Sequence, residues 1–200
     1  MSLLERSLAA GLILAVIAAG GCGYTTRSMV TTKYKTIYIE PFVNKVDITQ
    51  ETDTSTRYKI YRPSVETELT KSVISKYLFD GNLKPVKKET ADLVLKGELI
   101  EFRKDPLRYS TNDEVDEYRI NIVVNITLQE PKTEGEVPAA EGDAAEEKII
   151  WKESGFTGDS TYYPATTSLQ NVVTKSEDVA VTDAINDLAR RIVERTVEEW

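Results

Sequence analysis

Cys22 carries the only thiol in this chain of 200 residues, which also contains no histidine. A single cysteine cannot form an internal disulfide bond or one of the cysteine-rich sites that hold structural zinc. Without histidine, the chain lacks the commonest general base and the commonest metal ligand. What remains is a free or covalently modified thiol at Cys22, together with carboxylates as the only plentiful catalytic groups. No metal site and no catalytic residue is predicted.

The residues before Cys22 indicate a modified thiol. A continuous apolar run at 8–19 is too short to span a bilayer, which takes about 20 apolar residues, but it has the length of the hydrophobic region of a signal peptide. Small residues at 19–21 then lead directly into the cysteine. This arrangement resembles the lipobox of bacterial lipoproteins, in which the signal is cut before the cysteine and the cysteine is acylated.

We therefore expect residues 1–21 to be a lipoprotein signal peptide and residues 22–34 to be a lipidated tether. The covalent lipid on Cys22 would be the only attached group, and no cofactor is expected. Gly23 stands where aspartate commonly signals retention in the inner membrane of enteric bacteria. This favours the outer membrane of a Gram-negative bacterium, with the domain facing the periplasm. The alternative is an ordinary signal peptide cleaved near Ala19, which would leave a free thiol.

The net charge of −8 argues against a nucleic-acid partner, because nucleic-acid binding usually needs a basic stripe. The chain is long enough to bury the core of one domain, which we expect at 35–200. Within it, 44–61 reads as a long polar loop and 105–116 as a polar hairpin tip. The stretch 131–147 has almost no bulky apolar residue, which predicts a flexible acidic insertion.

The stretch 117–130 has the clearest strand pattern, because every second residue from Tyr118 to Leu128 is apolar. Such alternation is typical of a sheet with one buried face. Weaker strand patterns are found at 35–44, 91–104 and 148–163.

Two stretches have the period of amphipathic helices, 62–82 and 176–200. Their apolar faces are formed by Val65, Leu69, Val73 and Tyr77 in the first and by Val181, Ile185, Leu188 and Ile192 in the second. Thr174 and Glu177 have the spacing of a capping box at the start of the second helix.

The predicted order is β-α-β-β-β-α, an α+β fold. The simplest arrangement is a two-layer sandwich, a mostly antiparallel four-stranded sheet with two helices on one face. The strand–helix–strand connection at the start can be a parallel crossover.

Several segments together resemble one family. The lipobox with "GCGY", the strand "TIYIEPFVN", "ADLVLKGEL", "EYRINIVVNITL" and the final "LARRIVERTVEEW" are similar to the layout of the LPS-assembly lipoproteins, the LptE family. The resemblance implies a protein that catalyses no reaction. It also implies a role as plug and assembly partner of the LPS-export β-barrel, LptD, and contact with LPS on its way to the outer leaflet.

In that family, LPS is contacted through basic residues near the tip of the central hairpin and near the start of the last helix. The resemblance therefore implies LPS binding by Arg103, Lys104 and Arg108 at the tip and by Lys175 before the helix. Lipid A carries phosphates, which attract such side chains. The alternative is that all four are solvated surface charges.

Two other functions remain open from the sequence. The chain can be a generic outer-membrane lipoprotein that serves as an interaction module in another envelope or secretion complex. It can also be an enzyme that uses carboxylates, although Glu98 and Glu101 lie on a strand pattern that predicts solvated side chains. A co-purifying β-barrel would favour the plug role over the generic interaction module. Paired buried acids in a cleft would support the enzyme.

Overall fold

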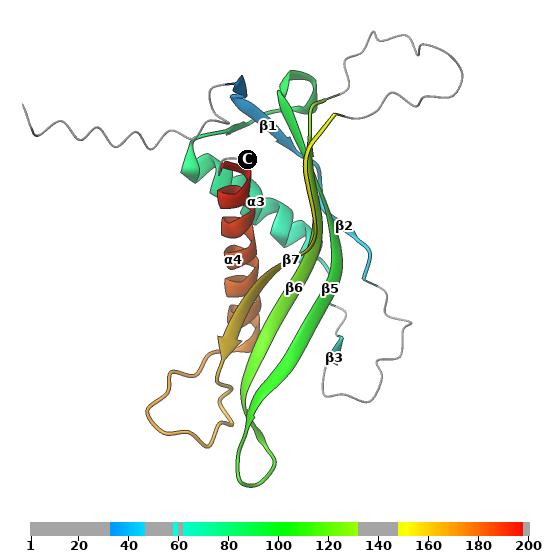
Figure 1. Ribbon diagram of the computed structural model, residues 1–200. Coiled ribbons are helices and arrows are strands. Elements are labelled where there is room, and N and C mark those ends of the chain that lie inside the picture. The colour runs from blue at the N-terminus through cyan, green and yellow to red at the C-terminus, as the bar shows by residue number, and fades with distance from the viewer. Residues whose placement is uncertain (1–32, 47–57, 60–61, 132–147, 198–200) are drawn as a thin grey trace, which may run out of the picture.

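The computed structural model describes residues 33–46, 58–59, 62–131 and 148–197. They form one sheet with two helices packed on the same side of it (Figure 1), which confirms the α+β class and the two-layer arrangement. The predicted signal peptide, Cys22, and nearly all of the predicted tether and acidic insertion lie outside the described residues. Among the helices that are described, none is long and apolar enough to cross a bilayer.

Three long antiparallel strands make up most of the sheet: β5 (Leu93–Tyr109), β6 (Val115–Gln129) and β7 (Ile149–Tyr162). β5 and β6 run further than the sequence indicates, so the turn between them is 110–114 and not the whole of 105–116. The end of β5 does not alternate between apolar and polar side chains and gives no strand signal. Main-chain pairing extends it, with Pro106 opposite Tyr118.

The sheet is mixed, and the expectation of a mostly antiparallel four-stranded sheet is wrong in this detail. β1 (Thr36–Ile39) is parallel to β5, as the helical crossover between them allows. The strand order is β4-β1-β5-β6-β7, and two further strands also pair with β5. The additional strands have two residues each, too few to show a period: β2 (Val43–Asn44), β3 (Tyr58–Lys59) and β4 (Lys84–Pro85).

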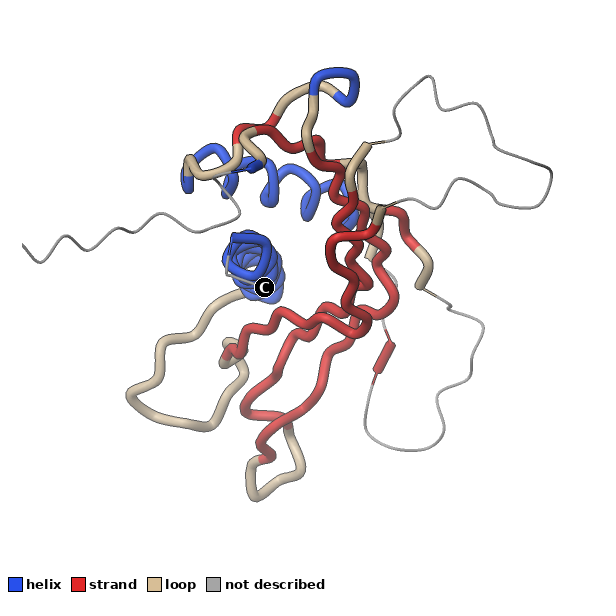
Figure 2. Tube along the Cα trace, turned by 45° about the horizontal axis from the view of Figure 1, so that its top comes forward, coloured by secondary structure: helices blue, strands red, loops and turns tan. Residues whose placement is uncertain are grey.

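The core lies between the helices and one face of the sheet. The predicted apolar residues of β6 from Ile120 to Leu128 are fully buried, and so is the predicted face of α3 (Val65–Asp80). The predicted face of α4 (Glu177–Val197) is buried as well. Figure 2 shows α4 nearly end-on, within the curve of the strands. The buried side chains form one continuous cluster.

Gly158 sets how closely α4 approaches β7. A Cβ atom at this position would lie 2.4 Å from Leu188 Cβ and 2.7 Å from Leu188 Cα, which is closer than such atoms pack. Glycine is therefore the residue that lets the helix backbone rest on the strand. This contact fixes α4 relative to the sheet, and with it the side chains of the first turn of α4.

The molecule has two distinct ends (Figure 1). The tip end contains the hairpin turn 110–114, the adjoining parts of β5 and β6, the loop 163–176 and the start of α4. At the opposite end lies the lysine edge, which we define as residues 33–36 and 84–92. It includes β4, the short helix η1 (Lys88–Thr90) and the first residues that the structure describes.

Candidate anion-binding pocket at the tip end

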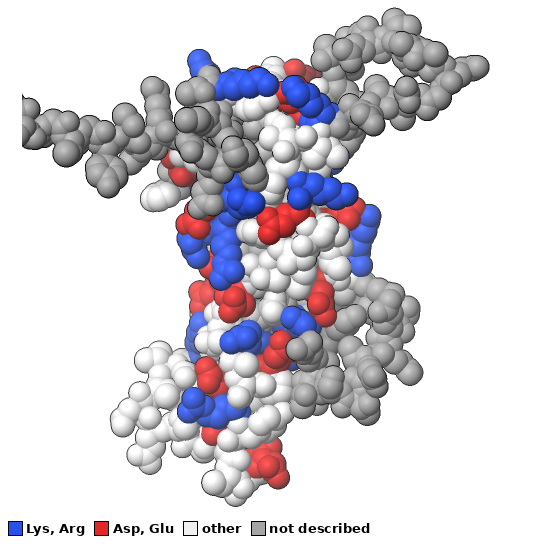
Figure 3. Space-filling model, in the orientation of Figure 1, with Lys and Arg blue, Asp and Glu red and all other residues white. Residues whose placement is uncertain are grey.

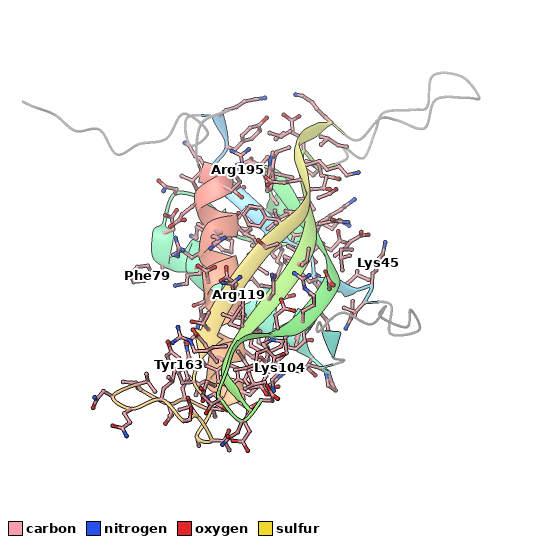
Figure 4. All side chains as sticks on the ribbon, turned by 60° about the horizontal axis from the view of Figure 1, so that its bottom comes forward. Lys45, Phe79, Lys104, Arg119, Tyr163 and Arg195 are labelled. Atoms are coloured by element: carbon pink, nitrogen blue, oxygen red, sulfur yellow. The ribbon has the colours of Figure 1, made fainter. Side chains whose placement is uncertain are left out.

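A hollow of about 480 Å³ opens at the tip end between the sheet and the start of α4. Each of the three long strands contributes one side chain to it, Lys104 from β5, Tyr118 from β6 and Tyr162 from β7. Its rim is formed by Pro164, Ala165, Thr166, Thr174, Lys175, Ser176 and Glu177. Figure 4 shows Lys104 and Tyr163 at this end, far from Arg195.

Lys104 lies against two tyrosine rings and one carboxylate. Its ammonium nitrogen is 4.4 Å from the centroid of the Tyr118 ring and 6.0 Å from that of Tyr162, and it pairs with the carboxylate of Glu177. The two rings stack with their centroids 5.6 Å apart, and the Tyr162 hydroxyl donates to Glu177 Oε2 at 3.2 Å. The site thus holds a positive charge on an aromatic floor.

Burial and pairing act on the pKa of Lys104 in opposite directions. Partial burial by itself lowers this pKa, but hydrogen bonds to Glu177 and Tyr162 outweigh the burial, so the pKa lies above its ordinary value. Burial raises the pKa of the Tyr162 phenol. At neutral pH the pocket therefore keeps a protonated lysine beside a neutral phenol.

Lys175 brings a second amine to the same pocket, from the residue before the helix cap. Its Nζ donates to Asp183 Oδ2 at 2.7 Å and to Ser160 Oγ at 3.1 Å. Its backbone N–H donates to the carbonyl of Tyr163 at 3.1 Å, which ties the end of the loop to the end of β7. Both lysines of the pocket are therefore paired with a carboxylate.

The start of α4 differs from the predicted capping box. Ser176, not Thr174, caps the helix, because its Oγ accepts the backbone N–H of Val179 at 3.4 Å and its carbonyl accepts that of Ala180. Thr174 instead forms an isolated parallel bridge with Tyr163. The shift leaves the carboxylate of Glu177 free to face Lys104 and Tyr162.

Asp116 ties the hairpin to the loop 163–176. This buried carboxylate accepts hydrogen bonds from the Ser168 backbone N–H at 2.6 Å, from Ser168 Oγ at 2.8 Å and from Thr167 Oγ1 at 3.1 Å. These hydrogen bonds, led by that of the Ser168 N–H, hold the pKa of Asp116 below its ordinary value. The loop that forms the pocket rim is thereby fixed to β6.

The other two predicted LPS-binding residues lie outside the pocket. Arg108 is on the hairpin near the turn, with its side chain 56% exposed and its Nε 3.7 Å from Glu117 Oε2. Arg103 precedes Lys104 on β5, so its side chain points to the opposite face of the sheet. There it is only 16% exposed and lies between the carboxylates of Glu101 and Asp105.

The structure therefore brings Lys104 and Lys175 together and places Arg108 at the same end. Arg108 lies opposite Glu117 and Arg103 opposite Asn121, so both arginines are on the face of the sheet away from the pocket. Sequence reasoning missed Tyr118, Tyr162 and Asp116 as parts of the site. Tyr118 and Tyr162 have ordinary strand positions, and nothing in their spacing marks them as neighbours. Asp116 directly precedes "EYR", and nothing in the sequence indicates that its hydrogen-bond partners lie about fifty residues later, at Thr167 and Ser168.

The arrangement suits reversible binding of an anion. Two primary amines line a hollow with an aromatic floor, and an incoming phosphate can replace the carboxylates that now pair with them. Within the described ranges, no group of carboxylates or other ligand side chains is arranged to hold a metal ion. Glu98, one of the two strand carboxylates, pairs with Lys45 on the surface and not with a second acid.

Several solved structures are distantly similar to this chain. The hypothetical protein CT253 from Chlamydia trachomatis is 14% identical with a TM-score of 0.45, covering 81% of this chain and 95% of that one. The PelC dodecamer from Paraburkholderia phytofirmans is 10% identical with a TM-score of 0.44, covering 88% of this chain and 96% of that one. Rare lipoprotein B from Shewanella oneidensis is 16% identical with a TM-score of 0.39, covering 79% of this chain and 92% of that one. At these scores they say nothing about function.

No curated protein sequence matches the chain. Among protein-family models, that of LptE, described as lipopolysaccharide-assembly, matches residues 34–196. The match covers α3, all but the last residue of α4, and all the strands from β1 to β7. It confirms the family resemblance drawn from the sequence motifs. The chain therefore belongs to the LptE family of lipopolysaccharide-assembly proteins.

Proposed function

We propose that this protein is an outer-membrane lipoprotein of a Gram-negative bacterium that pairs with the LPS-export β-barrel LptD and helps deliver LPS to the outer leaflet. The observation that carries this proposal is the family match over residues 34–196. The lipid anchor at Cys22 and the periplasmic orientation are parts of the same proposal. The protein would act by binding, without catalysing a reaction.

LPS would be contacted at the tip end. We assign its phosphates to Lys104 and Lys175 in the pocket, with Arg108 as an additional contact on the hairpin. The two lysines are supported by their shared hollow and by its aromatic floor. Arg103 is not part of this assignment, because it lies between two carboxylates.

The carboxylates beside the lysines suit a protein that passes LPS onward. A phosphate has to displace Glu177 from Lys104 and Asp183 from Lys175 before it binds. This exchange weakens the net affinity, because a paired charge gains less from a new partner. Binding would then be local and reversible, which agrees with the overall acidity of the chain.

The test is co-purification from native membranes. The full chain carries a tag at its C-terminus, membranes are extracted in mild detergent, and the recovered proteins are identified by mass spectrometry. We expect a stoichiometric outer-membrane barrel of the LptD type. Recovery of the lipoprotein alone, or with an unrelated envelope complex, would contradict the proposed partnership and favour a generic interaction module.

A further inference from the structure

The lysine edge is strongly basic in an acidic protein. Residues 33–36 and 84–92 contain five lysines and two carboxylates, whereas the net charge of the whole chain is −8. All five side chains are exposed: Lys33, Lys35, Lys84, Lys87 and Lys88. Blue side chains run along the corresponding upper rim of the molecule in Figure 3.

Backbone pairing holds these lysines together. The Lys84 N–H donates to the carbonyl of Lys35 at 2.9 Å, because β4 pairs with β1 at the edge of the sheet. The Thr90 N–H donates to the carbonyl of Lys87 at 3.1 Å and closes the short helix η1. The backbone positions of these lysines are thus fixed relative to one another, so their side chains all extend from one edge of the sheet.

Most lysines of this array form no direct ion pair within the described ranges, and Asp92 acts on Lys35 only through space. Lys33 pairs with Glu130, but Lys35, Lys84, Lys87 and Lys88 form no ion pair with any residue that the structure describes. Asp92, the obvious candidate partner, is instead occupied by the backbone N–H groups of Lys35 and Thr36, each at 2.9 Å. These amides hold the pKa of Asp92 below its ordinary value.

The composition of the array favours a diffuse charged surface over a single phosphate group. All five cations are lysines, which are hydrated point charges, and there is no arginine fork to grip one phosphate in two places. Basic clusters of this kind next to a membrane anchor bind anionic lipid surfaces.

The position of the array points to the same partner. Lys33 follows Cys22 by 11 residues, and an extended chain of this length reaches about 40 Å at most. We infer that the lysine edge is a docking surface for anionic phospholipid headgroups, which holds the β4 edge of the sheet against the membrane that carries the lipid anchor. This inference rests on the anchoring of Cys22 in the proposed function, but not on the LptD partnership.

The experiment uses the full mature lipoprotein. Mass spectrometry of its N-terminal peptide first establishes the acyl group on Cys22, and the protein is then inserted into vesicles of phosphatidylcholine, with or without phosphatidylglycerol. An amine-reactive reagent labels the lysines, and the labelling of each is quantified by mass spectrometry. The internal control is Lys71, an exposed lysine of α3 outside the edge.

We expect phosphatidylglycerol to lower the labelling of Lys35, Lys84, Lys87 and Lys88 at least about fivefold, in line with the affinity that each lysine gains near an anionic surface. Labelling of Lys71 should not change. About 1 M salt should abolish the protection, because charge interactions are then screened within about 3 Å. Equal labelling in both vesicle types would overturn the inference and leave the lysines only the role of discouraging pairing at a sheet edge.

Two further arms separate the competing explanations. Vesicles in which LPS replaces phosphatidylglycerol test the other anionic lipid, and protection by LPS alone would overturn the assignment to phospholipid. The triple variant Lys84→Gln, Lys87→Gln and Lys88→Gln should lose the protection of Lys35, whereas a double variant of Lys71 and Lys76 on α3 should keep it. Full protection of Lys35 in the triple variant would contradict a joint surface.

Failures of this inference and of the proposed function can be told apart. An acylated Cys22 with unprotected lysines would overturn the docking surface and leave the co-purification result untouched. An unmodified Cys22 would remove the anchor and the docking surface together. Absence of a co-purifying barrel, with lysines protected in the vesicles, would contradict the partnership alone.

Discussion

The tip end and the lysine edge both present lysines, but they treat the charge in different ways. In the pocket, Lys104 and Lys175 each face a carboxylate and a hydroxyl within a hollow. Along the edge, the carboxylate of Asp92 is occupied by backbone amides, and neighbouring lysines such as Lys87 have no ion-pair partner in the described structure. The same residue type is thus prepared for a specific, exchangeable contact at one end and for an unspecific surface at the other.

Loosening the frame between the two ends should have the largest effect. In Gly158→Ala, the new Cβ overlaps the backbone of Leu188, so α4 has to move away from β7. We expect a loss of about 1–3 kcal/mol in the free energy of unfolding. Urea denaturation measures it, with Ser75→Ala on the exposed side of α3 as the control. An unchanged unfolding free energy would show that α4 is not held at this contact.

Removing the pocket charges tests whether the tip end is the specific one. Lys104→Gln and Lys175→Gln should each lower the affinity for LPS about tenfold, because each removes a charged hydrogen-bond donor to phosphate. Binding is measured by titration with purified LPS, and thermal melting verifies the fold. Lys71→Gln should bind as the wild type does. Wild-type affinity in Lys104→Gln would remove the pocket from the proposed LPS site.

Releasing the pocket rim should have a comparable but local effect. Asp116→Ala deletes the acceptor of three hydrogen bonds, so the amide of Ser168 should exchange with deuterium about tenfold faster at neutral pH. The folded-state pKa of Asp116 is lowered, so its stabilisation is complete above the ordinary pKa near 3.9 and is lost as the pH falls through the lower folded-state value. The difference between wild type and variant should therefore shrink in acid. A pH-independent difference would show that the charge of Asp116 contributes nothing.

Removing the carboxylate of Glu177 makes Lys104 resemble the unpaired lysines of the lysine edge, and so sharpens the comparison between the two ends. Glu177→Gln should bind LPS about two to five times more tightly, since a partly exposed ion pair contributes less than about 1 kcal/mol. The matched control is Asp178→Asn, which removes the neighbouring carboxylate that pairs with Arg62. Equal effects in both variants would indicate a change in overall charge only.

The smallest effect is expected where the edge does carry a paired charge. Glu130 accepts hydrogen bonds from Tyr34, Lys148 and Lys33, which lower its pKa to about 2. Its pairing should contribute less than about 1 kcal/mol, because the site is close to solvent. This contribution is present above the ordinary pKa of 4.5 and is lost as the pH falls toward 2. The free energy of unfolding of the wild type and of Glu130→Gln is measured across this pH range. The difference between the two should shrink toward pH 2, and an identical pH profile would contradict the prediction.

The long, one-face-buried elements could be predicted from the sequence. Apolar residues recur at every second position from Ile120 to Leu128 and at every fourth position from Val65 to Tyr77 because these side chains are buried on one face of the element. Strands of two residues cannot show a period, so β3 and β4 were missed, and β2 was not distinguished from β1 within the strand predicted at 35–44. The parallel pairing of β1 with β5 could be predicted only as one possibility, because a strand–helix–strand connection allows a parallel crossover.

The site was less accessible to sequence reasoning, because it is made of residues from four elements. Lys104 and Lys175 were named through the family resemblance, yet nothing in their spacing indicates that they share a hollow. Glu177 was interpreted as a capping residue, and a shift of the cap from Thr174 to Ser176 changes its role. Side-chain partners of this kind depend on the twist of the sheet and not on local pattern.

The bridge between Tyr163 and Thr174 has a consequence for how this protein can change over evolutionary time. The bridge closes the intervening loop at its base, so the chain leaves the sheet and returns to α4 at almost the same place. Substitutions, insertions or deletions between these two residues alter the rim of the pocket without moving the lysines that bridge and strand hold in place. Ligand preference can therefore diversify through changes in this loop, while the sheet and α4 stay under separate selection.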